Sequence, residues 1–295
     1  MMHARSVFPN RVLPYLLVLP QLLVVAVFFL WPALRVIGEA AYTVNAFGMN
    51  PRFAGLHNFV SAMASGRYAN SVAVTAIYSA MTTLLSMALG LLIAVLVDGV
   101  RKGRAVYRTL FAWTYAVPTA VVGTLWLFMF QPEIGAAARL LNHVGIPWNF
   151  NIRGFDSMSL IIMLTVWQQA AYNFLFFTAG LQGISAHVLE AATLDGAGAI
   201  RRFWRITFPL LSPTTFYLLV LNIVYVFFST FAIINIVTQG GPYDATDTMV
   251  YQIYLDAFQD SNTSIAAAET VLLIVLVSAL TVLQFRYVNR RVHYQ

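Results

Sequence analysis

Six long stretches with almost no charge constrain this fold more than any other feature of the sequence. A helix that spans a bilayer needs roughly 20 consecutive apolar residues. Five of the stretches contain no Asp, Glu, Lys or Arg, and the sixth contains only Glu269. They are 12–34, 68–97, 109–132, 157–189, 206–243 and 265–285. The sequence therefore predicts an all-α integral membrane protein with six transmembrane helices.

The composition supports a membrane protein over a soluble one. Hydrophobic residues make up 60% of the chain and charged residues only 9%, whereas a soluble domain has about 25% charged residues. The first apolar stretch is 23 residues long, which exceeds the roughly 7–15 residues of a signal-peptide core. We therefore expect it to be a retained helix instead of a cleaved signal.

The distribution of basic residues predicts the orientation, because cytoplasmic segments carry an excess of Lys and Arg. If the N-terminus is cytoplasmic, twelve of the 17 basic residues fall on the cytoplasmic side. They are Arg5, Arg11, Arg101, Lys102, Arg104, Arg108, Arg201, Arg202, Arg205, Arg286, Arg290 and Arg291. Both termini are then cytoplasmic. The net charge of +6 follows from this asymmetry, so it indicates contact with a membrane and no nucleic-acid partner.

The chain divides into three expected parts. Residues 1–66 contain the first transmembrane helix and an external loop that reads as an appendage. Residues 67–286 form a core of five helices, which includes a polar segment at 185–209. Residues 287–295 form a cytoplasmic tail.

Several kinds of chemistry are absent from the sequence. There are no cysteines, which excludes disulfides, thiol catalysis and cysteine-ligated metals. No two of the five histidines are four residues apart, and Lys102 is followed by Gly103, so neither a helical zinc motif nor a phosphate-binding loop is present. We expect no catalytic, metal-binding or cofactor-binding residues, and any ATP must be bound by another subunit. A membrane enzyme would need a nucleophile–base pair or a metal cluster, and the sequence offers neither.

Glu269 is the only carboxylate within the six stretches. An ionisable residue inside a membrane is costly and usually has a function. Glu269 lies near the external end of the last stretch, so we expect it to reach toward water at the interface, with a pore-facing position as the alternative. A stand-alone secondary transporter is the competing functional class, but the chain has few intramembrane carboxylates and no visible inverted repeat.

A polar segment interrupts the chain between the fourth and fifth stretches, with the sequence EAATLDGAGAIRRFWRITFP at 190–209. We expect Ser185 to cap a short helix and Asp195-Gly196 to form a turn. A second short helix follows, with Arg201, Arg202 and Arg205 facing water and Ile200, Phe203 and Trp204 facing an apolar environment. Ser212 and Pro213 fit the N-cap and first position of the fifth transmembrane helix.

Two interpretations of the polar segment remain open from its residues alone. An amphipathic linker at the membrane interface accounts for the basic residues. It does not account for Glu190 followed by two alanines. Small residues beside one carboxylate favour a protein–protein contact, because a partner can approach the backbone closely.

The polar segment resembles the signature of the permease subunits of binding-protein-dependent ABC importers. That signature is Glu-Ala-Ala, three residues, Gly, nine residues, Ile, one residue, Leu-Pro. The matching residues are Glu190, Ala191, Ala192, Gly196, Ile206 and Pro209, with Asp195 also at its usual place, and the departure is Phe208 in place of Leu. Segments 172–184, 208–213 and 238–242 are similar to the carbohydrate-type permeases related to the maltose transporter. Within them, the whole chain is most similar to first permease subunits of sn-glycerol-3-phosphate importers.

The resemblance implies the ABC importer type I permease fold in a bacterial inner membrane. It implies that the 185–209 segment couples to a cytoplasmic ATPase, that Glu190 pairs with a basic group of that ATPase, and that Gly196 permits the bend. The expected partners are two ATPase copies, which bind ATP and magnesium, a second and different permease, an external solute-binding protein and membrane lipid. The implied substrate is sn-glycerol 3-phosphate.

Polar uncharged residues gather in the fourth and fifth stretches and are candidates for the translocation pathway. Such residues face a water-filled cavity or hydrogen-bond neighbouring helices, and both roles remain open. The polar candidates are Gln168, Gln169, Tyr172, Asn173, Asn222, Tyr225, Ser229 and Thr230. The family resemblance implies that Trp167, Gln168, Gln169, Tyr172 and Thr230 lie where sugar-transporting relatives hold their ligand. Since the stretches contain no Lys or Arg, a neutral sugar or polyol is the alternative substrate.

Overall fold

The computed structural model describes residues 12–44, 50–100 and 102–287, and the chain in it divides into two compact units. The first unit comprises residues up to 63 together with 253–272, and the second comprises 64–252 with the remainder. The basic residues Arg5, Arg11, Arg101, Arg290 and Arg291, and all but the first residue of the expected tail, lie outside the described residues.

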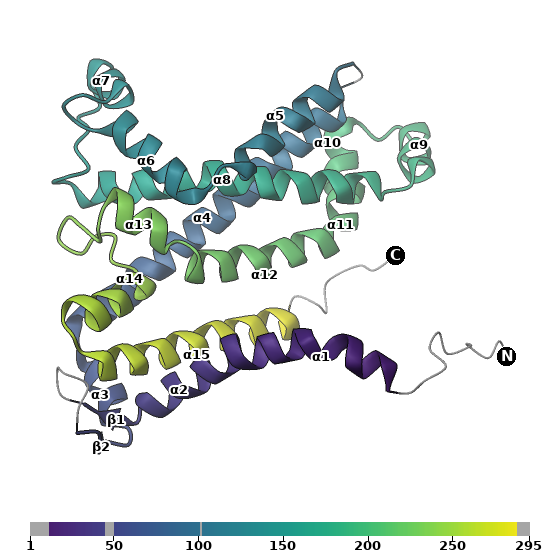
Figure 1. Cartoon of the computed structure of the whole chain (residues 1–295). Helices are drawn as coiled ribbons and strands as arrows, with labels where there is room; N and C mark the ends of the chain where they lie inside the picture. The colour runs from purple at the N-terminus through teal and green to yellow at the C-terminus, as the bar shows by residue number, and fades with distance from the viewer. Residues whose placement is uncertain (1–11, 45–49, 101, 288–295) are drawn as a thin grey trace. The chain divides into compact units, whose positions relative to one another are not determined.

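The first unit is built on one long apolar helix and a small hairpin (Figure 1). The helix comprises α1 (Leu13–Val25), a π-helical turn (Ala26–Leu30) and α2 (Trp31–Glu39). It leads into antiparallel β1 (Tyr42–Thr43) and β2 (Arg52–Phe53), and then into α3 (His57–Ala64). No side chain of α1 or α2 is buried, as suits a helix surrounded by lipid.

Asn58 fixes the junction between these elements. Its side chain is 1% exposed, and its Nδ2 donates to the carbonyls of Ala40 and Tyr42, both at 2.9 Å. Ala40 packs against Ala267 and Ala268 of α15 (Thr263–Tyr287). One amide thus holds the end of α2, the hairpin and α3 together.

Two crossing helices, α4 (Gly66–Asp98) and α8 (Gly154–Gln182), form the centre of the second unit (Figure 1). Small residues let membrane helices approach closely, and α4 buries a row of them. The row consists of Ser71, Thr75, Ser79, Thr82, Thr83, Ser86, Gly90 and Ala94. A hydrogen bond of 2.6 Å between the hydroxyls of Tyr78 and Thr165 joins the same two helices.

The third apolar stretch is not one straight helix. It is divided into α5 (Arg104–Ala116) and α6 (Thr119–Phe130), with a bend of 93° between them. Pro118 explains the break, because proline lacks a backbone donor and disfavours helical backbone in the preceding residue. Val117 is accordingly extended, with ψ of 127°. The external connection to α8 then contains α7 (Ala136–His143).

The fifth apolar stretch is also divided. α12 (Ser212–Phe228) has Ser229 as its C-cap, and α13 (Phe231–Val237) follows. The loop after α13 is closed by Thr246, whose Oγ1 donates to Oγ1 of Thr238 at 2.8 Å. α14 (Met249–Tyr254) and a π-helical turn (Leu255–Gln259) then lead toward α15.

Four helices of the described residues are long and apolar enough to cross a membrane. They are Leu13–Glu39, Gly66–Asp98, Gly154–Gln182 and Thr263–Arg286. Two bent helix pairs pass the same test, so the count reaches six if each pair is one span. The all-helical membrane class is confirmed at this level.

The expectation that Glu269 reaches toward water is wrong for this structure. Its residue is 1% exposed. Ala266, Ala267 and Ala268 directly precede it and are also buried. The start of α15 is therefore buried around this carboxylate.

Candidate functional site: the coupling segment and the polar cavity

The polar segment folds as two short helices joined by a tight turn, as the sequence predicted. They are α9 (Ala186–Leu194) and α10 (Ala199–Arg202). Gly196 lies in the turn with φ of +79°, a conformation that costs other residues energy because of their Cβ atom. The Ala197 amide donates to the Ala192 carbonyl at 3.0 Å, which closes the end of α9.

Two predicted helix starts differ in detail. Ser185 occupies the N-cap position of α9, but its side chain makes no capping hydrogen bond. The N-cap of α12 is Leu211, so Ser212 is its first residue and not its cap. Leu211 takes this place because its side chain is buried, at 1% exposure, in the apolar cluster that contains Phe177 and Ile184.

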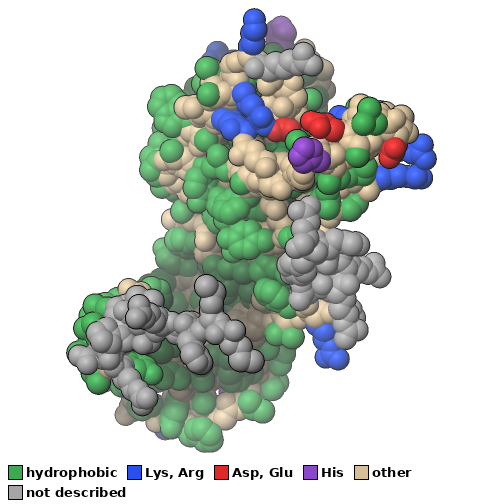
Figure 2. Space-filling view, turned by 90° about the vertical axis from the view of Figure 1, so that its right-hand side faces the viewer, with side chains coloured by type: hydrophobic (Ala, Val, Ile, Leu, Met, Phe, Trp, Pro, Cys, Tyr) green, Lys and Arg blue, Asp and Glu red, His purple; other side chains and the backbone are tan. Residues whose placement is uncertain are grey.

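The Glu-Ala-Ala part of the segment presents a carboxylate on open surface. Glu190 and Ala191 are exposed, whereas Ala192 is buried against the fold. Nδ1 of His187 is 3.9 Å from Oε2 of Glu190. Asp195 is exposed as well. Figure 2 shows acidic, basic and histidine side chains gathered where α9 and α10 lie, in contrast to the apolar surface nearby.

The division of residues 200–205 into a wet and a dry side stays a prediction, because side chains from both sides lie on the surface of the chain and Phe203 is half-buried. Ile200 is 78% exposed and Trp204 is 60% exposed. Arg202 is instead partly buried, because its Nη1 donates to Oγ1 of Thr193 at 2.7 Å. This bond joins the Arg202 guanidinium to α9. Arg201 and Arg205 are exposed, as predicted.

The end of the segment leads directly into α12. A π-helical turn (Phe203–Thr207) and α11 (Phe208–Leu210) contain the half-buried Ile206 and Pro209. The helical stretch from Ala199 to Leu210 meets α12 at a bend of 65°. The segment is therefore tied at one end to α8 and at the other to α12.

Four of the predicted pathway residues line one cavity of about 220 Å³ in the second unit. Gln169 and Tyr172 come from α8, and Tyr225 and Ser229 come from α12 and its end. The remaining lining residues are Tyr115, Leu221 and Val224. The rings of Tyr115 and Tyr172 are 5.2 Å apart. Hydroxyl and amide groups thus supply the polarity, and no Lys, Arg or His is among the described residues that line this cavity.

The other predicted pathway residues lie outside this cavity. Nε2 of Gln168 donates to the Val117 carbonyl at 3.0 Å, at the break between α5 and α6. Oγ1 of Thr230 donates to the Val226 carbonyl at 2.9 Å. Trp167 lines an apolar groove of about 680 Å³ that also includes Trp126. Asn173 and Asn222 are fully buried and bond to each other.

The comparisons with known proteins agree with this geometry. A family profile described as "Binding-protein-dependent transport system inner membrane component" matches residues 86–294. The chain belongs to this family. It is thus a multi-pass inner membrane permease subunit of the ABC importer class and not an enzyme.

Two relatives cover essentially the whole chain. The sn-glycerol-3-phosphate transport system permease protein UgpA of Agrobacterium fabrum (strain C58) is 50% identical over 288 residues, 98% of each chain. The protein of the same name from Salmonella typhi is 44% identical over 295 residues, the full length of both chains.

Solved structures confirm the type I importer fold. A permease chain of a bacterial ABC transporter involved in the import of the acidic polysaccharide alginate superposes with a TM-score of 0.83 and 22% identity. That superposition covers 94% of this chain and 95% of the other. At this identity the likeness establishes the fold alone.

The sequence did not single out two residues of this permease that the structure brings to the site. Tyr115 lies at the end of α5, where the break at Pro118 places it beside the cavity. The available signal in the sequence was that Tyr115 lies three residues before Pro118, where a helix is expected to end. Ser86 contacts both Asn173 and Asn222, but it is one of many Ser and Thr residues in α4 and nothing in the sequence distinguishes it.

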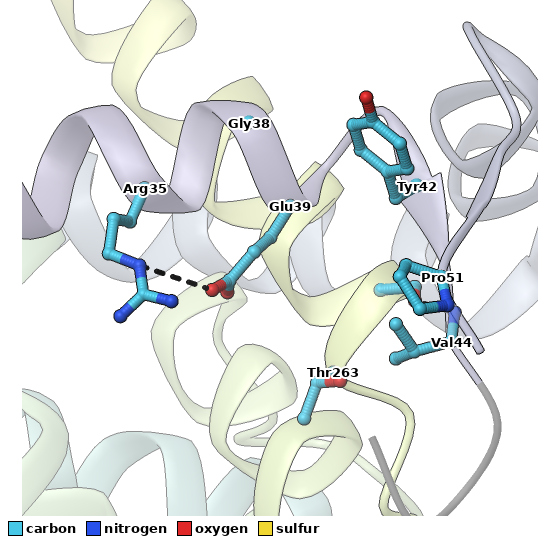
Figure 3. Close-up of a pocket in the computed structure, with 8 residues that line it drawn as sticks. Arg35, Gly38, Glu39, Tyr42, Val44, Pro51 and Thr263 are labelled. Carbon is cyan, nitrogen blue, oxygen red and sulfur yellow. Dashed lines mark hydrogen bonds and ion pairs between the residues drawn. The ribbon is translucent and has the colours of Figure 1, made fainter. Parts of the chain in front are cut away.

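The first unit of the permease contains a further cavity, of about 640 Å³, beside the end of α2 (Figure 3). Arg35 and Glu39 lie along one side, with Nε of Arg35 4.0 Å from Oε1 of Glu39. The other labelled residues of the lining are Gly38, Tyr42, Val44, Pro51 and Thr263. Both charged side chains are more than half exposed, so this ion pair adds little to stability.

Proposed function

We propose that this permease imports sn-glycerol 3-phosphate and forms half of the translocation pathway. The relatives at 44% and 50% identity carry that substrate in their names. In this arrangement the chain crosses the membrane six times with both termini in the cytoplasm, and each bent helix pair is one span. The distribution of Lys and Arg supports this orientation.

The coupling role rests chiefly on one observation. An exposed Glu190-Ala191 pair stands on a two-helix segment whose ends continue directly into α8 and α12. A partner that moves this segment pulls on both helices that line the polar cavity. The proposed partner is one of two ATPase copies, which bind ATP and magnesium, with a basic group opposite Glu190. A second permease and an external solute-binding protein complete the importer.

The proposed pathway residues fall into two groups: four line the polar cavity, and the other five lie outside it. Gln169, Tyr172, Tyr225 and Ser229 face the cavity and are proposed to meet the substrate. Their neutral hydroxyl and amide groups suit the hydroxyls of a glycerol or sugar moiety. A phosphate ester carries nearly two negative charges at neutral pH, so the second permease is proposed to supply the cation for it. A neutral sugar or polyol is the second candidate substrate, favoured by this uncharged lining.

Uptake and co-purification test the proposal together. We expect cells with all partner subunits to lose uptake of labelled glycerol 3-phosphate when this chain is deleted, and unlabelled maltose not to compete. Glu190→Ala and Gly196→Trp are expected to lose co-purification of the ATPase. Glu133→Ala, which removes an exposed carboxylate far from α9 in sequence, is the matched control.

Each outcome separates the alternatives. Unchanged uptake of glycerol 3-phosphate on deletion would rule out that substrate and turn the search to neutral sugars and polyols. Full ATP-driven uptake by Gly196→Trp would show that 185–209 does not couple to the ATPase. A secondary transporter would be indicated if uptake followed an ion gradient with no ATPase attached.

A further inference from the structure

The two helices attached to the ends of the coupling segment are bonded to each other inside the membrane region. Asn173 of α8 and Asn222 of α12 are both 0% exposed. Nδ2 of Asn222 donates to Oδ1 of Asn173 at 2.7 Å, and Nδ2 of Asn173 donates to Oδ1 of Asn222 at 3.3 Å. The two amides thus form a reciprocal pair.

Ser86 brings a third helix into the same cluster. Nδ2 of Asn173 donates to Oγ of Ser86 at 3.1 Å. The single hydroxyl proton of Ser86 is shared between the Thr83 carbonyl at 3.2 Å and Oδ1 of Asn222 at 3.4 Å. Gly90, one turn further along α4, makes this approach possible. A Cβ atom at Gly90 would lie 2.6 Å from Cβ of Asn173 and 2.9 Å from the Phe174 nitrogen. We call Ser86, Asn173 and Asn222 the amide clamp.

The amide clamp lies beside the polar cavity. Gln169 and Tyr172 line the cavity four and one residues before Asn173, and Tyr225 lines it three residues after Asn222. Residues three or four apart are neighbours on a helix surface. The clamp therefore joins α8 and α12 within about one turn of the side chains that face the cavity.

We propose that the amide clamp makes α4, α8 and α12 one rigid body, which carries a displacement of the coupling segment to the cavity wall. The inference rests on the proposed function. Its physical basis is the cost of leaving buried amide groups without partners in apolar surroundings. If α8 and α12 separated at this level, both Asn–Asn hydrogen bonds would break, and the side-chain oxygen of Asn173 would lose the donor that Asn222 supplies; Asn222 would keep its bond to the Leu218 carbonyl, and Asn173 its bond to Ser86. Ser86, Asn173 and Asn222 are positioning residues, since they move the cavity wall without lining it.

The test measures substrate moved per ATP hydrolysed. The complete importer, with its ATPases, second permease and binding protein, is reconstituted in lipid vesicles with labelled glycerol 3-phosphate. For Asn222→Leu, the expected result is an assembled complex that still hydrolyses ATP but moves about fivefold less substrate per ATP, the lower end of usual coupling between sites. A purely structural role would lower the amount of complex and leave this ratio unchanged.

Two further variants keep the test decisive. Thr215→Val is the matched control on α12, because Oγ1 of Thr215 bonds only within its own helix, to the Leu211 carbonyl at 3.0 Å; it is expected to keep the wild-type ratio. Ser86→Ala removes one hydroxyl of the clamp and is expected to lower the ratio by a smaller factor, even if Asn222→Leu fails to assemble.

The results separate this inference from the proposed function. Wild-type ratios in both Ser86→Ala and any assembled Asn222→Leu complex would overturn the clamp while the importer assignment stands. Absence of ATP-driven uptake by the wild-type chain with its partners would overturn the proposed function, and this inference with it.

Discussion

Nη1 of Arg202 donates a hydrogen bond of 2.7 Å to Oγ1 of Thr193, which ties α10 back onto α9 across the turn at Gly196. Thr193 also donates to the Leu189 carbonyl at 2.8 Å, so its hydroxyl both donates and accepts. The two short helices of the coupling segment are thereby held at one angle. A partner that binds the segment meets a surface that is already shaped.

Loss of this bond is expected to weaken binding of the ATPase. Thr193→Val removes the acceptor while keeping the shape of the side chain, and we expect about fivefold weaker association, the effect of one hydrogen bond of about 1 kcal/mol. Titration of the purified ATPase subunit onto the permease measures it. Thr193→Ser retains the hydroxyl and should bind as the wild type does. Equal affinities for Val and Ser would show that the bond has no part in binding.

At Gly196 the backbone conformation is expected to matter more than side-chain volume. A Cβ atom there meets nothing within 4 Å in this chain, but φ is +79°. A β-branched residue in this region costs about 1–2 kcal/mol or more, whereas Asn adopts it readily. Gly196→Val should therefore lower ATP-driven uptake strongly, and Gly196→Asn only slightly. Similar uptake in both variants would refute the backbone explanation.

The hydroxyls of Tyr115 and Tyr225 are expected to contribute to substrate binding in the polar cavity. Tyr115→Phe and Tyr225→Phe keep the ring and remove one hydroxyl each. Loss of one hydrogen bond should raise KM for uptake about two- to tenfold. Tyr107→Phe, on the same helix as Tyr115 but at an exposed position outside the cavity lining, is the control. An unchanged KM in both cavity variants would argue against this cavity as the substrate site.

Asn58 is expected to hold the first unit together. Asn58→Leu leaves the carbonyls of Ala40 and Tyr42 without the donor that now serves both. Each unsatisfied buried group costs about 1–3 kcal/mol, so the hairpin should open more often. Trypsin cleavage after the exposed Arg52 reports this opening. Asn70→Leu removes an exposed side-chain donor in the second unit and should leave cleavage at Arg52 unchanged; faster cleavage there too would point to a general loss of stability.

The positions of the long helices could be predicted because apolar length is a local property. The uncharged stretch 68–97 corresponds to α4 (Gly66–Asp98) within two residues at each end. The stretch 157–189 begins three residues after the start of α8 (Gly154–Gln182) and continues seven residues past its end. The polar segment was equally readable, since the turn at Gly196 and the small residues around Glu190 depend on neighbours in sequence. Its resemblance to a known family added the expectation of an ATPase partner.

Side-chain environments could not be predicted, because they depend on residues distant in sequence. Glu269 is 1% exposed, although its place near a helix end suggested water. Arg202 was expected to face water, but its guanidinium bonds to Thr193 on another helix. Pro118 marks in the sequence a place where a helix can break, but the bend of 93° between α5 and α6 depends on what these helices pack against.

The sequence by itself determined the membrane class, the approximate helix ranges and the turn between the two short helices of the polar segment, since hydrophobic length and turn chemistry act over short segments. Only the tertiary structure decided the roles of the polar residues in α8 and α12. Gln169 and Tyr172 face a cavity, whereas Asn173, the next residue, bonds across to Asn222. Adjacent residues on a helix point about 100° apart, so their roles depend on which neighbouring helix each one meets.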